Sequence, residues 1–234
     1  MHLTAKQFLN LDISFPGISF GYESWALDSY LKVLDDQIAH ARDQYRLRAE
    51  RQLENQKGEL ERLEYSQQLM QIDEAADAQI PRFFRIGAVV SIWGLFESFL
   101  TDFAVYVGKR EKVGLSFKEV KADNFRDQIR KYFEKVVRVD VPWSSDEWSR
   151  LGQLQDLRNV LAHRNGRLMD LPQEQEEKVK KLVARISGVS IDGSTVVVGP
   201  EYISSASKLV FETVGRFSQQ LANKYVVPIP SSVA

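Results

Sequence analysis

A short stretch, Arg158 to His163, contains three side chains that could act together on a phosphate group. The imidazole of His163 is a candidate general acid or base, because histidine exchanges protons near neutral pH. The guanidinium of Arg158 can bind phosphate oxygens as a bidentate fork and offset the charge that develops on them. Asn159 can orient the imidazole or the phosphate. Such a set suits proton transfer beside a phosphodiester without a metal ion.

These residues resemble the R-x4-6-H motif of the HEPN superfamily, whose members are small helical bundles. Many members are metal-independent RNA endonucleases in toxin, phage-defence and RNA-processing systems. The resemblance implies that Arg158, Asn159 and His163 are catalytic positions and that RNA is the substrate. It also implies a homodimer with a composite cleft, and a possible cognate antitoxin. The motif covers six residues, and the bundle around it extends the resemblance in pattern only, over about 82–186.

The spacing of the motif restricts its geometry. Residues five apart on a continuing helix differ by about 140° around the axis, so Arg158 and His163 would diverge. Asn159 and His163 would share a face. Convergence of Arg158 and His163 therefore requires the helix to end near Ala162, or the motifs of two protomers to face each other. The second alternative agrees with the homodimer.

Glu97 is a further candidate for the site. Trp93 lies four residues before Glu97, Phe96 lies directly before it, and Leu100 lies three residues after it. These spacings place Glu97 on the apolar face of a helix. A buried carboxylate needs a cationic or hydrogen-bonding partner, and Arg158 is the natural candidate. HEPN domains often carry an acidic residue on the helix packed against the motif. Glu97 is expected to be a structural ion pair or a member of the catalytic set.

A weaker pattern of basic and polar residues predicts contacts with RNA. It comprises Arg126, Arg130, Lys131, Arg164 and Asn165. The formal net charge of the chain is -1, so nucleic-acid binding must come from such a local patch rather than from the whole molecule.

The amino-acid composition limits which other kinds of functional site the chain could form. There are no cysteines, which excludes thiolate metal sites and a cysteine nucleophile. The three histidines, His2, His40 and His163, are scattered and lack the spacing of a helical zinc site. We therefore expect no cofactor and no metal. The N-terminus does not resemble a signal peptide, and charged residues interrupt the most apolar stretch, so we expect a cytoplasmic protein without a membrane span.

The elements that must position these residues are mainly helical. Alternating spacings of four and three residues predict a long helical arm over 22–80, with a first apolar set at Leu27, Leu31, Leu34, Ile38, Ala41 and Tyr45 and a second at Leu53, Leu60, Leu63 and Met70. The polar stretch between the sets allows one long helix or a helical pair that turns near Gln56 to Gly58. We favour the pair.

Turn and cap signals divide the rest of the chain. Pro81 marks a new helix start, Ser144 to Glu147 begins the motif helix, and Asn165 with Gly166 ends it. Asp192 and Gly193 between β-branched runs predict a hairpin. The expected organisation is a lead-in over 1–21 and one helical HEPN-like domain over 22–225, followed by a tail over 226–234. The domain comprises the arm at 22–80, a core bundle at 82–186, a β-hairpin at 188–199 and a last helix at 200–225.

These observations predict a mainly α fold: a HEPN-like helical bundle with a long protruding helical pair and one small β-hairpin near the C-terminus. The resemblance implies an endoribonuclease, a toxin or phage-defence effector. Two alternatives stay open: an inactive HEPN-like scaffold in a defence or regulatory complex, and a coiled-coil adaptor built on the arm.

Overall fold

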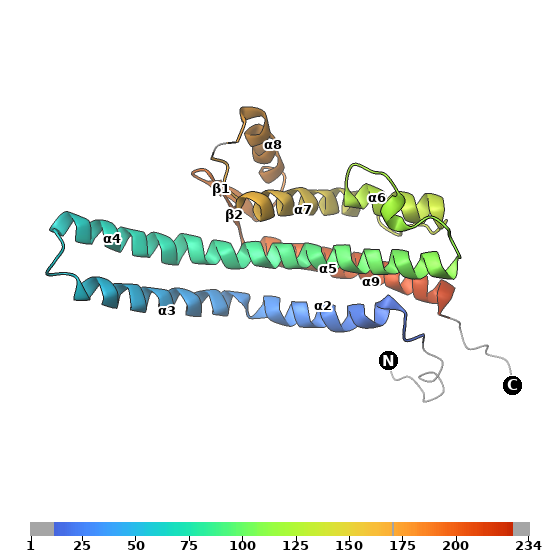
Figure 1. Cartoon of the computed structure of the whole chain (residues 1–234), viewed down its shortest axis with the longest axis horizontal. Helices are drawn as coiled ribbons and strands as arrows, with labels where there is room; N and C mark the ends of the chain where they lie inside the picture. Colours follow the sequence, from blue (N-terminus) through green and yellow to red (C-terminus); the bar gives the residue numbers. More distant parts are fainter. Residues whose placement is uncertain (1–11, 170, 227–234) are drawn as a thin grey trace. The chain divides into compact units, whose positions relative to one another are not determined.

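The computed structural model describes residues 12–169 and 171–226, which form helices and one pair of strands. This confirms the predicted mainly α fold with a small hairpin near the C-terminus. The ends of the predicted lead-in and tail, 1–11 and 227–234, lie outside the described residues. The elements are α2 (Pro16–Lys32), α3 (Leu34–Asn55), α4 (Arg62–Glu74), η1 (Ala75–Gln79), α5 (Ile80–Arg110), η2 (Phe117–Glu119), α6 (Phe125–Lys131), η3 (Tyr132–Val136), α7 (Ser145–Arg164), α8 (Gln173–Val183), β1 (Val189–Asp192), β2 (Thr195–Val198) and α9 (Pro200–Tyr225) (Figure 1).

The chain forms two compact units. Unit 1 comprises Met1–Ala26, Ile92–Gly152 and Ser207–Ala234, and unit 2 comprises Leu27–Ser91 and Gln153–Ala206. Helices α2, α5, α7 and α9 each contribute residues to both units. The motif, the helical pair and the β-hairpin belong to unit 2.

Helix α2 begins earlier than the sequence predicted. The expected lead-in over 1–21 is wrong for its last residues, because the helix starts at Pro16 and includes Gly17 and Gly21. Proline suits a first helical turn, where its missing N–H is not needed. Phe15 and Phe20 are buried and lie against Tyr106 and Phe99, with ring centroids 5.4 Å and 5.1 Å apart. This aromatic packing outweighs the low helix propensity of the two glycines.

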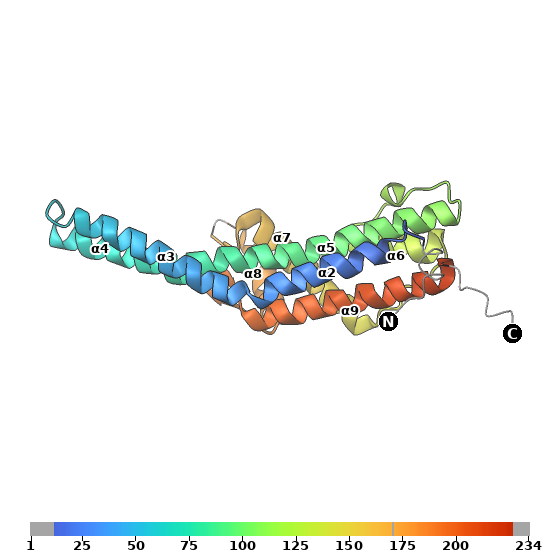
Figure 2. The same ribbon diagram turned by 90° about the horizontal axis from the view of Figure 1, so that it is seen from below.

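The predicted helical pair is confirmed in unit 2. Helices α3 and α4 run side by side, and the chain between them turns over 56–61, close to the predicted tip (Figures 1 and 2). Glu61 caps α4 by exchanging hydrogen bonds with Glu64 at the third helical position. Near the base of the pair, Arg46 contacts Asp77 at 2.9 Å and Asp73 at 3.2 Å, and Arg42 also pairs with Asp77. These ion pairs join the two helices.

The second apolar set of the arm is correct at Leu53, which is buried at the end of α3, and wrong for the part that falls on α4. Leu63 and Met70 are 68% and 72% exposed, whereas Ile72 is buried. The heptad phase was extended from Leu53 as if one helix continued, but the turn at the tip resets the phase. A new helix can present a different face to its partner, and α4 does so.

Pro81 does not separate two helices, contrary to the prediction. The chain stays helical from Arg62 to Arg110, and the five-residue π-turn η1 precedes the proline. In that turn the N–H of Ile80 donates to the carbonyl of Ala75, five residues back. A proline ring normally clashes with the carbonyl four residues earlier, and π-turns are a common way in which a helix absorbs such an irregularity.

The core of unit 1 is aromatic. Its largest fully buried side chains include Trp93, Phe96, Phe103, Phe133 and Phe217. Phe217 of α9 contacts Phe133 edge-on at 4.7 Å and Phe103 of α5 at 5.9 Å. Edge-to-face pairs at such distances stabilise a core beyond the apolar area they bury.

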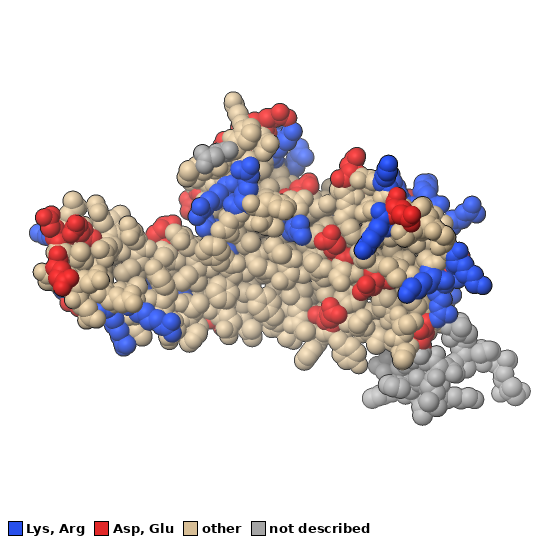
Figure 3. Space-filling view, viewed as in Figure 1, with Lys and Arg blue, Asp and Glu red and all other residues tan. Residues whose placement is uncertain are grey.

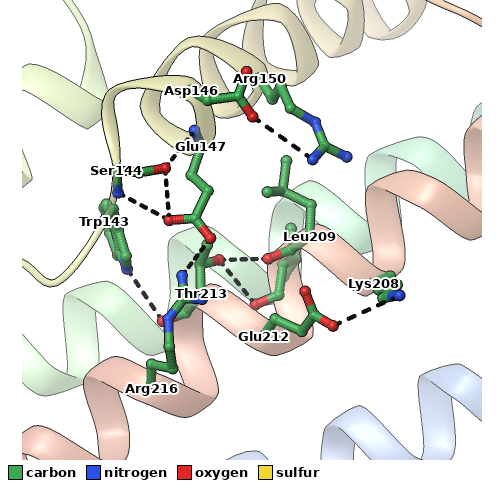
Figure 4. A network of polar contacts seen from close by, with 11 residues as sticks. Trp143, Ser144, Asp146, Glu147, Arg150, Lys208, Leu209, Glu212, Thr213 and Arg216 are labelled. Carbon is green, nitrogen blue, oxygen red and sulfur yellow. Dashed lines mark hydrogen bonds and ion pairs between the residues drawn. The ribbon is translucent and has the colours of Figure 1, made fainter.

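The start of α7 is fastened within unit 1, as Figure 4 shows. The N–H of Glu147 donates to Oγ of Ser144 at 3.2 Å, and the N–H of Ser144 donates to the Glu147 carboxylate at 2.9 Å. This is the helix cap that the sequence predicted. Arg216 of α9 pairs with the same carboxylate, and the indole N–H of Trp143 donates to the carbonyl of Thr213 at 3.1 Å. The first turn of the motif helix is therefore held to α9.

The predicted hairpin is confirmed in unit 2. Strands β1 and β2 are antiparallel, with Val189 opposite Val198 and Asp192 opposite Thr195. Gly193 has φ +55° and open space around it, as the tight turn requires. The carbonyl of Val198 accepts a hydrogen bond from Arg85 at 3.3 Å, which ties β2 to the first turns of α5.

In the described part of the chain, one helix, Arg62–Arg110, is long and apolar enough to span a membrane when only its length and composition are considered. Half of its most apolar window is buried inside the protein. The core helix of a soluble protein has this same pattern.

Candidate functional site

The motif lies on the last two turns of α7, in unit 2. Leu154, Leu157 and Leu161 are buried and define the inner face of the helix. Arg158 and Asn159 are half-buried at the border of that face. Nη1 of Arg158 donates a hydrogen bond to Oδ1 of Asn159 at 3.1 Å. The structure therefore brings these two predicted site residues into direct contact.

His163 stands apart from this pair. Its side chain is exposed, and among the described residues it forms no hydrogen bond or ion pair. Helix α7 continues to Arg164, so the helix does not end near Ala162 as a converging single-chain site would require. Arg158 and His163 then point about 140° apart around the helix axis. Asn159 and His163, four residues apart, share a face. This divergence agrees with facing motifs of two protomers, and the homodimer stays a prediction.

The chain turns sharply after His163. Asn165 and Gly166 have φ of 55° and 74°, the left-handed conformation of a helix C-cap, as predicted. The Gly166 carbonyl accepts a hydrogen bond from the N–H of Val196 at 2.8 Å. A Cβ at Gly166 would lie 3.1 Å from the carbonyl oxygen of Val196. Glycine is required here because backbone meets backbone.

Two arginines that the sequence reasoning did not select lie near this turn. Arg167 forms an isolated bridge with Thr195 of β2. The pKa of Arg82, at the start of α5, is lowered first by burial and then by repulsion from Arg167, with Glu74 acting in the opposite direction. No sequence signal relates these arginines, since 85 residues separate them in the chain.

Glu97 lies in unit 1, on α5, and its side chain is half-buried rather than fully buried. Its carbonyl accepts a hydrogen bond from the Thr101 hydroxyl at 2.8 Å. Arg158 lies in unit 2, and the expected contact between Glu97 and Arg158 stays a prediction.

The predicted RNA-binding side chains of α6 have partners inside unit 1. Nη1 of Arg126 donates to the Trp148 carbonyl at 2.7 Å, and Arg130 pairs with Glu134 at 2.8 Å. Nζ of Lys131 donates to the Lys121 carbonyl at 3.3 Å. Arg130 and Lys131 remain exposed, so contact with RNA stays a prediction for them. Arg164 is exposed at the end of α7, beside Asn165.

Within residues 12–169 and 171–226, no three His, Asp or Glu side chains gather as metal ligands would. The polar groups of the motif region are instead guanidinium, amide and imidazole, which bind anions or exchange protons.

Comparison with known proteins does not assign this chain to a family, so its function must be argued from the chemistry of these residues. No family model, no curated protein and no solved structure matches this chain.

Proposed function

We propose that the chain is a metal-independent endoribonuclease of the HEPN type that acts as a homodimer. The observation that carries the proposal is an exposed His163 on the same last turns of α7 as the half-buried, hydrogen-bonded pair of Arg158 and Asn159. The imidazole is accessible to a substrate, and the guanidinium is oriented by its neighbour. These are the two groups that RNA cleavage without a metal requires.

In the proposed reaction, one imidazole takes the proton of a ribose 2′-hydroxyl. The 2′-oxygen then attacks the adjacent phosphorus, and the bond from phosphorus to the 5′-oxygen of the next nucleotide breaks. An imidazolium gives a proton to that leaving oxygen. The products are a 2′,3′-cyclic phosphate and a 5′-hydroxyl, and Arg158 stabilises the charge on the non-bridging oxygens.

The homodimer follows from the directions of these side chains. Arg158 and His163 diverge on α7, so one motif does not surround a phosphate by itself. Two motifs facing across a two-fold axis would combine the guanidinium of one protomer with the imidazole of its partner. In each cleft the imidazolium formed by the first proton transfer would then supply the proton for the leaving oxygen.

The biological setting that the motif implies is a toxin or phage-defence effector in the cytoplasm. A ribonuclease of that kind needs a restraint, and a cognate antitoxin that covers the motif would provide it. The alternative is a HEPN-like scaffold that binds partners in a defence or regulatory complex and does not cleave RNA.

The test is cleavage of single-stranded RNA in the presence of a metal chelator. Wild-type protein should leave 2′,3′-cyclic phosphate ends. His163→Ala should lose about 10²-fold or more of the rate, the usual scale for a lost acid–base group. His40→Ala is the matched control, because His40 is an exposed helical histidine of α3, and it should cleave as wild type does. Equal cleavage by His163→Ala would refute the assignment, and no cleavage by the wild-type protein would favour the scaffold.

A further inference from the structure

A hollow of about 470 Å³ lies in unit 1 between the chain at 13–22 and the second half of α5. Apolar side chains are exposed around it. Ile13 and Tyr22 are 90% and 74% exposed, and Val105 of α5 is partly exposed. Figure 3 shows that uncharged residues form most of the visible surface over α2 and α5. Exposed apolar side chains that gather at one place are a mark of interaction surfaces.

Two charged side chains of α5 line the same hollow, one on each side of Val105. Asp102 and Lys109 are exposed, and neither side chain has an ion pair or a hydrogen bond within the part of the chain that the structure describes. They are seven residues apart, so they lie on one side of α5, about 10 Å apart along its axis. Burial raises the pKa of the Asp102 carboxyl group, and no cation of the described residues offsets this effect.

The stripe formed by Asp102, Val105 and Lys109 is complementary to itself. The midpoint of positions 102 and 109 falls directly after Val105. When two copies of α5 lie antiparallel about a two-fold axis at this midpoint, Asp102 of each copy is level with the partner's Lys109. The two Val105 side chains then pack near the axis. A parallel arrangement would instead set Asp102 against Asp102. The antiparallel contact therefore forms two ion pairs around an apolar centre.

Helix α2 adds an aromatic side chain to each end of this contact. Phe20 of α2 contacts Phe99 of α5, with ring centroids 5.1 Å apart. Tyr22 follows Phe20 by two residues and lines the hollow together with Asp102, which comes one turn after Phe99. In the two-fold contact this end receives the partner's Lys109, whose ammonium and methylene stem can lie against the tyrosine ring. The contact would thus cover a tyrosine that the single chain leaves in water.

We infer that this surface binds a second copy of the chain, with α5 antiparallel to α5 and Asp102 paired with the partner's Lys109. A second copy is favoured over a different protein because the stripe supplies both halves of its own charge pattern. The inference goes beyond the proposed function. The stripe belongs to unit 1 and uses neither Arg158 nor His163, which belong to unit 2.

The experiment measures the dissociation constant of the dimer for the full chain, by sedimentation of a concentration series. The variants are Asp102→Lys, Lys109→Asp and the double variant that exchanges both charges. Each single change sets like charges against each other at both ends of the contact, whereas the double variant restores two pairs of opposite charge. Lys208→Asp is the matched control, since Lys208 is an exposed cation of unit 1 on α9 with its amine 3.9 Å from Glu212. Circular dichroism checks that each variant is folded.

Each single variant should raise the dissociation constant about tenfold or more, because two attractive contacts become two repulsive ones. The double variant should return close to the wild-type value, and Lys208→Asp should dimerise as wild type does. Val105→Asp should also weaken the dimer, since it brings two carboxylates together near the two-fold axis. A monomeric wild-type chain would overturn the inference, and so would single variants that behave like the control or a double variant as weak as the single ones.

The contact and the ribonuclease can fail separately. An Asp102→Lys chain that is monomeric and still cleaves RNA would retain this contact and refute the composite cleft. A chain whose charge exchange restores the dimer but which cuts no RNA would retain this contact and lose the ribonuclease. A chain that cleaves RNA and stays dimeric in both single variants would retain the ribonuclease and lose this contact.

Discussion

Arg158 donates a hydrogen bond to the side chain of Asn159, its neighbour on α7, at 3.1 Å. The amide oxygen accepts from one arm of the guanidinium, which limits the directions in which the other arms can point. Asn159 also shares a helical face with His163, so it lies between the two chemical groups of the motif.

Replacing Asn159 should therefore affect catalysis more than stability. In Asn159→Ala the Arg158 guanidinium loses its neighbouring acceptor, and we expect kcat for RNA cleavage to fall roughly tenfold, in the range of a partly lost electrostatic contact. Asn159→Asp keeps an acceptor but adds a negative charge beside the phosphate, so KM should rise. Steady-state kinetics on a single-site RNA separates the two effects. Unchanged kcat in Asn159→Ala would show that this hydrogen bond does not position Arg158.

A composite cleft can be tested by mixing inactive protomers. Light scattering should first give twice the 26.8 kDa chain mass. His163→Ala and Arg158→Ala should each be inactive alone. Mixed and re-equilibrated, they should recover about a quarter of wild-type activity, because half of the dimers are mixed and each has one intact cleft. A stable mixed dimer without activity would argue against a site shared by two protomers.

Glu97 provides a test of the predicted partner of Arg158. Glu97→Gln should keep the fold, since it preserves shape and an acceptor, and should lower activity if the carboxylate orients Arg158. Glu97→Leu should destabilise the protein if it leaves the arginine without its counter-charge. On the same protein preparations, urea unfolding measures stability and cleavage assays measure activity. Full activity in Glu97→Gln would remove Glu97 from the catalytic set.

The cap of the motif helix should make stability depend on pH. The hydrogen bond from Arg216 is the main cause that lowers the pKa of Glu147, while burial opposes it. A lowered pKa means that this stabilisation is present above the unfolded value of about 4.3 and is lost as the pH falls below it. Glu147→Gln should therefore be less stable than wild type at pH 7, by about 1 kcal/mol for a weakened cap. The difference should shrink below about pH 4.

Asp146→Asn is the control for that experiment. Its side chain is 77% exposed and its nearest cation, Arg150, is 4.0 Å away. Chemical unfolding at several pH values should give a nearly constant, small difference from wild type. A pH-independent effect of Glu147→Gln would contradict the role of the charge.

The left-handed turn after the motif should not tolerate a side chain. Gly166→Ala should cost about 1 to 2 kcal/mol for the backbone conformation alone, and more because its Cβ would crowd the Val196 carbonyl. Gly193→Ala measures the cost of the backbone conformation alone, since Gly193 has a positive φ but open space around it. Thermal unfolding of both variants measures the difference. Equal losses of stability would show that Val196 moves aside.

The features that the sequence predicted correctly are local. Ser144 and Glu147 cap α7, Gly193 turns the hairpin, and Asn165 with Gly166 ends the motif helix. Each depends on backbone preferences and contacts within a few residues, so the neighbours in the chain are sufficient to determine it. The divergence of Arg158 and His163 is of the same kind, because it follows from the helical period.

The tertiary structure decided which faces are covered and which charges meet. Leu63 and Met70 have the spacing of buried residues but are exposed, because the phase of α4 depends on how it packs against α3. Pro81 would break an isolated helix, yet the chain continues through it by way of a π-turn. Arg167 forms its bridge with Thr195 only through packing of segments that are distant in the chain. Burial and electrostatic interactions depend on distances in space, and these distances cannot be read from the order of residues in the chain.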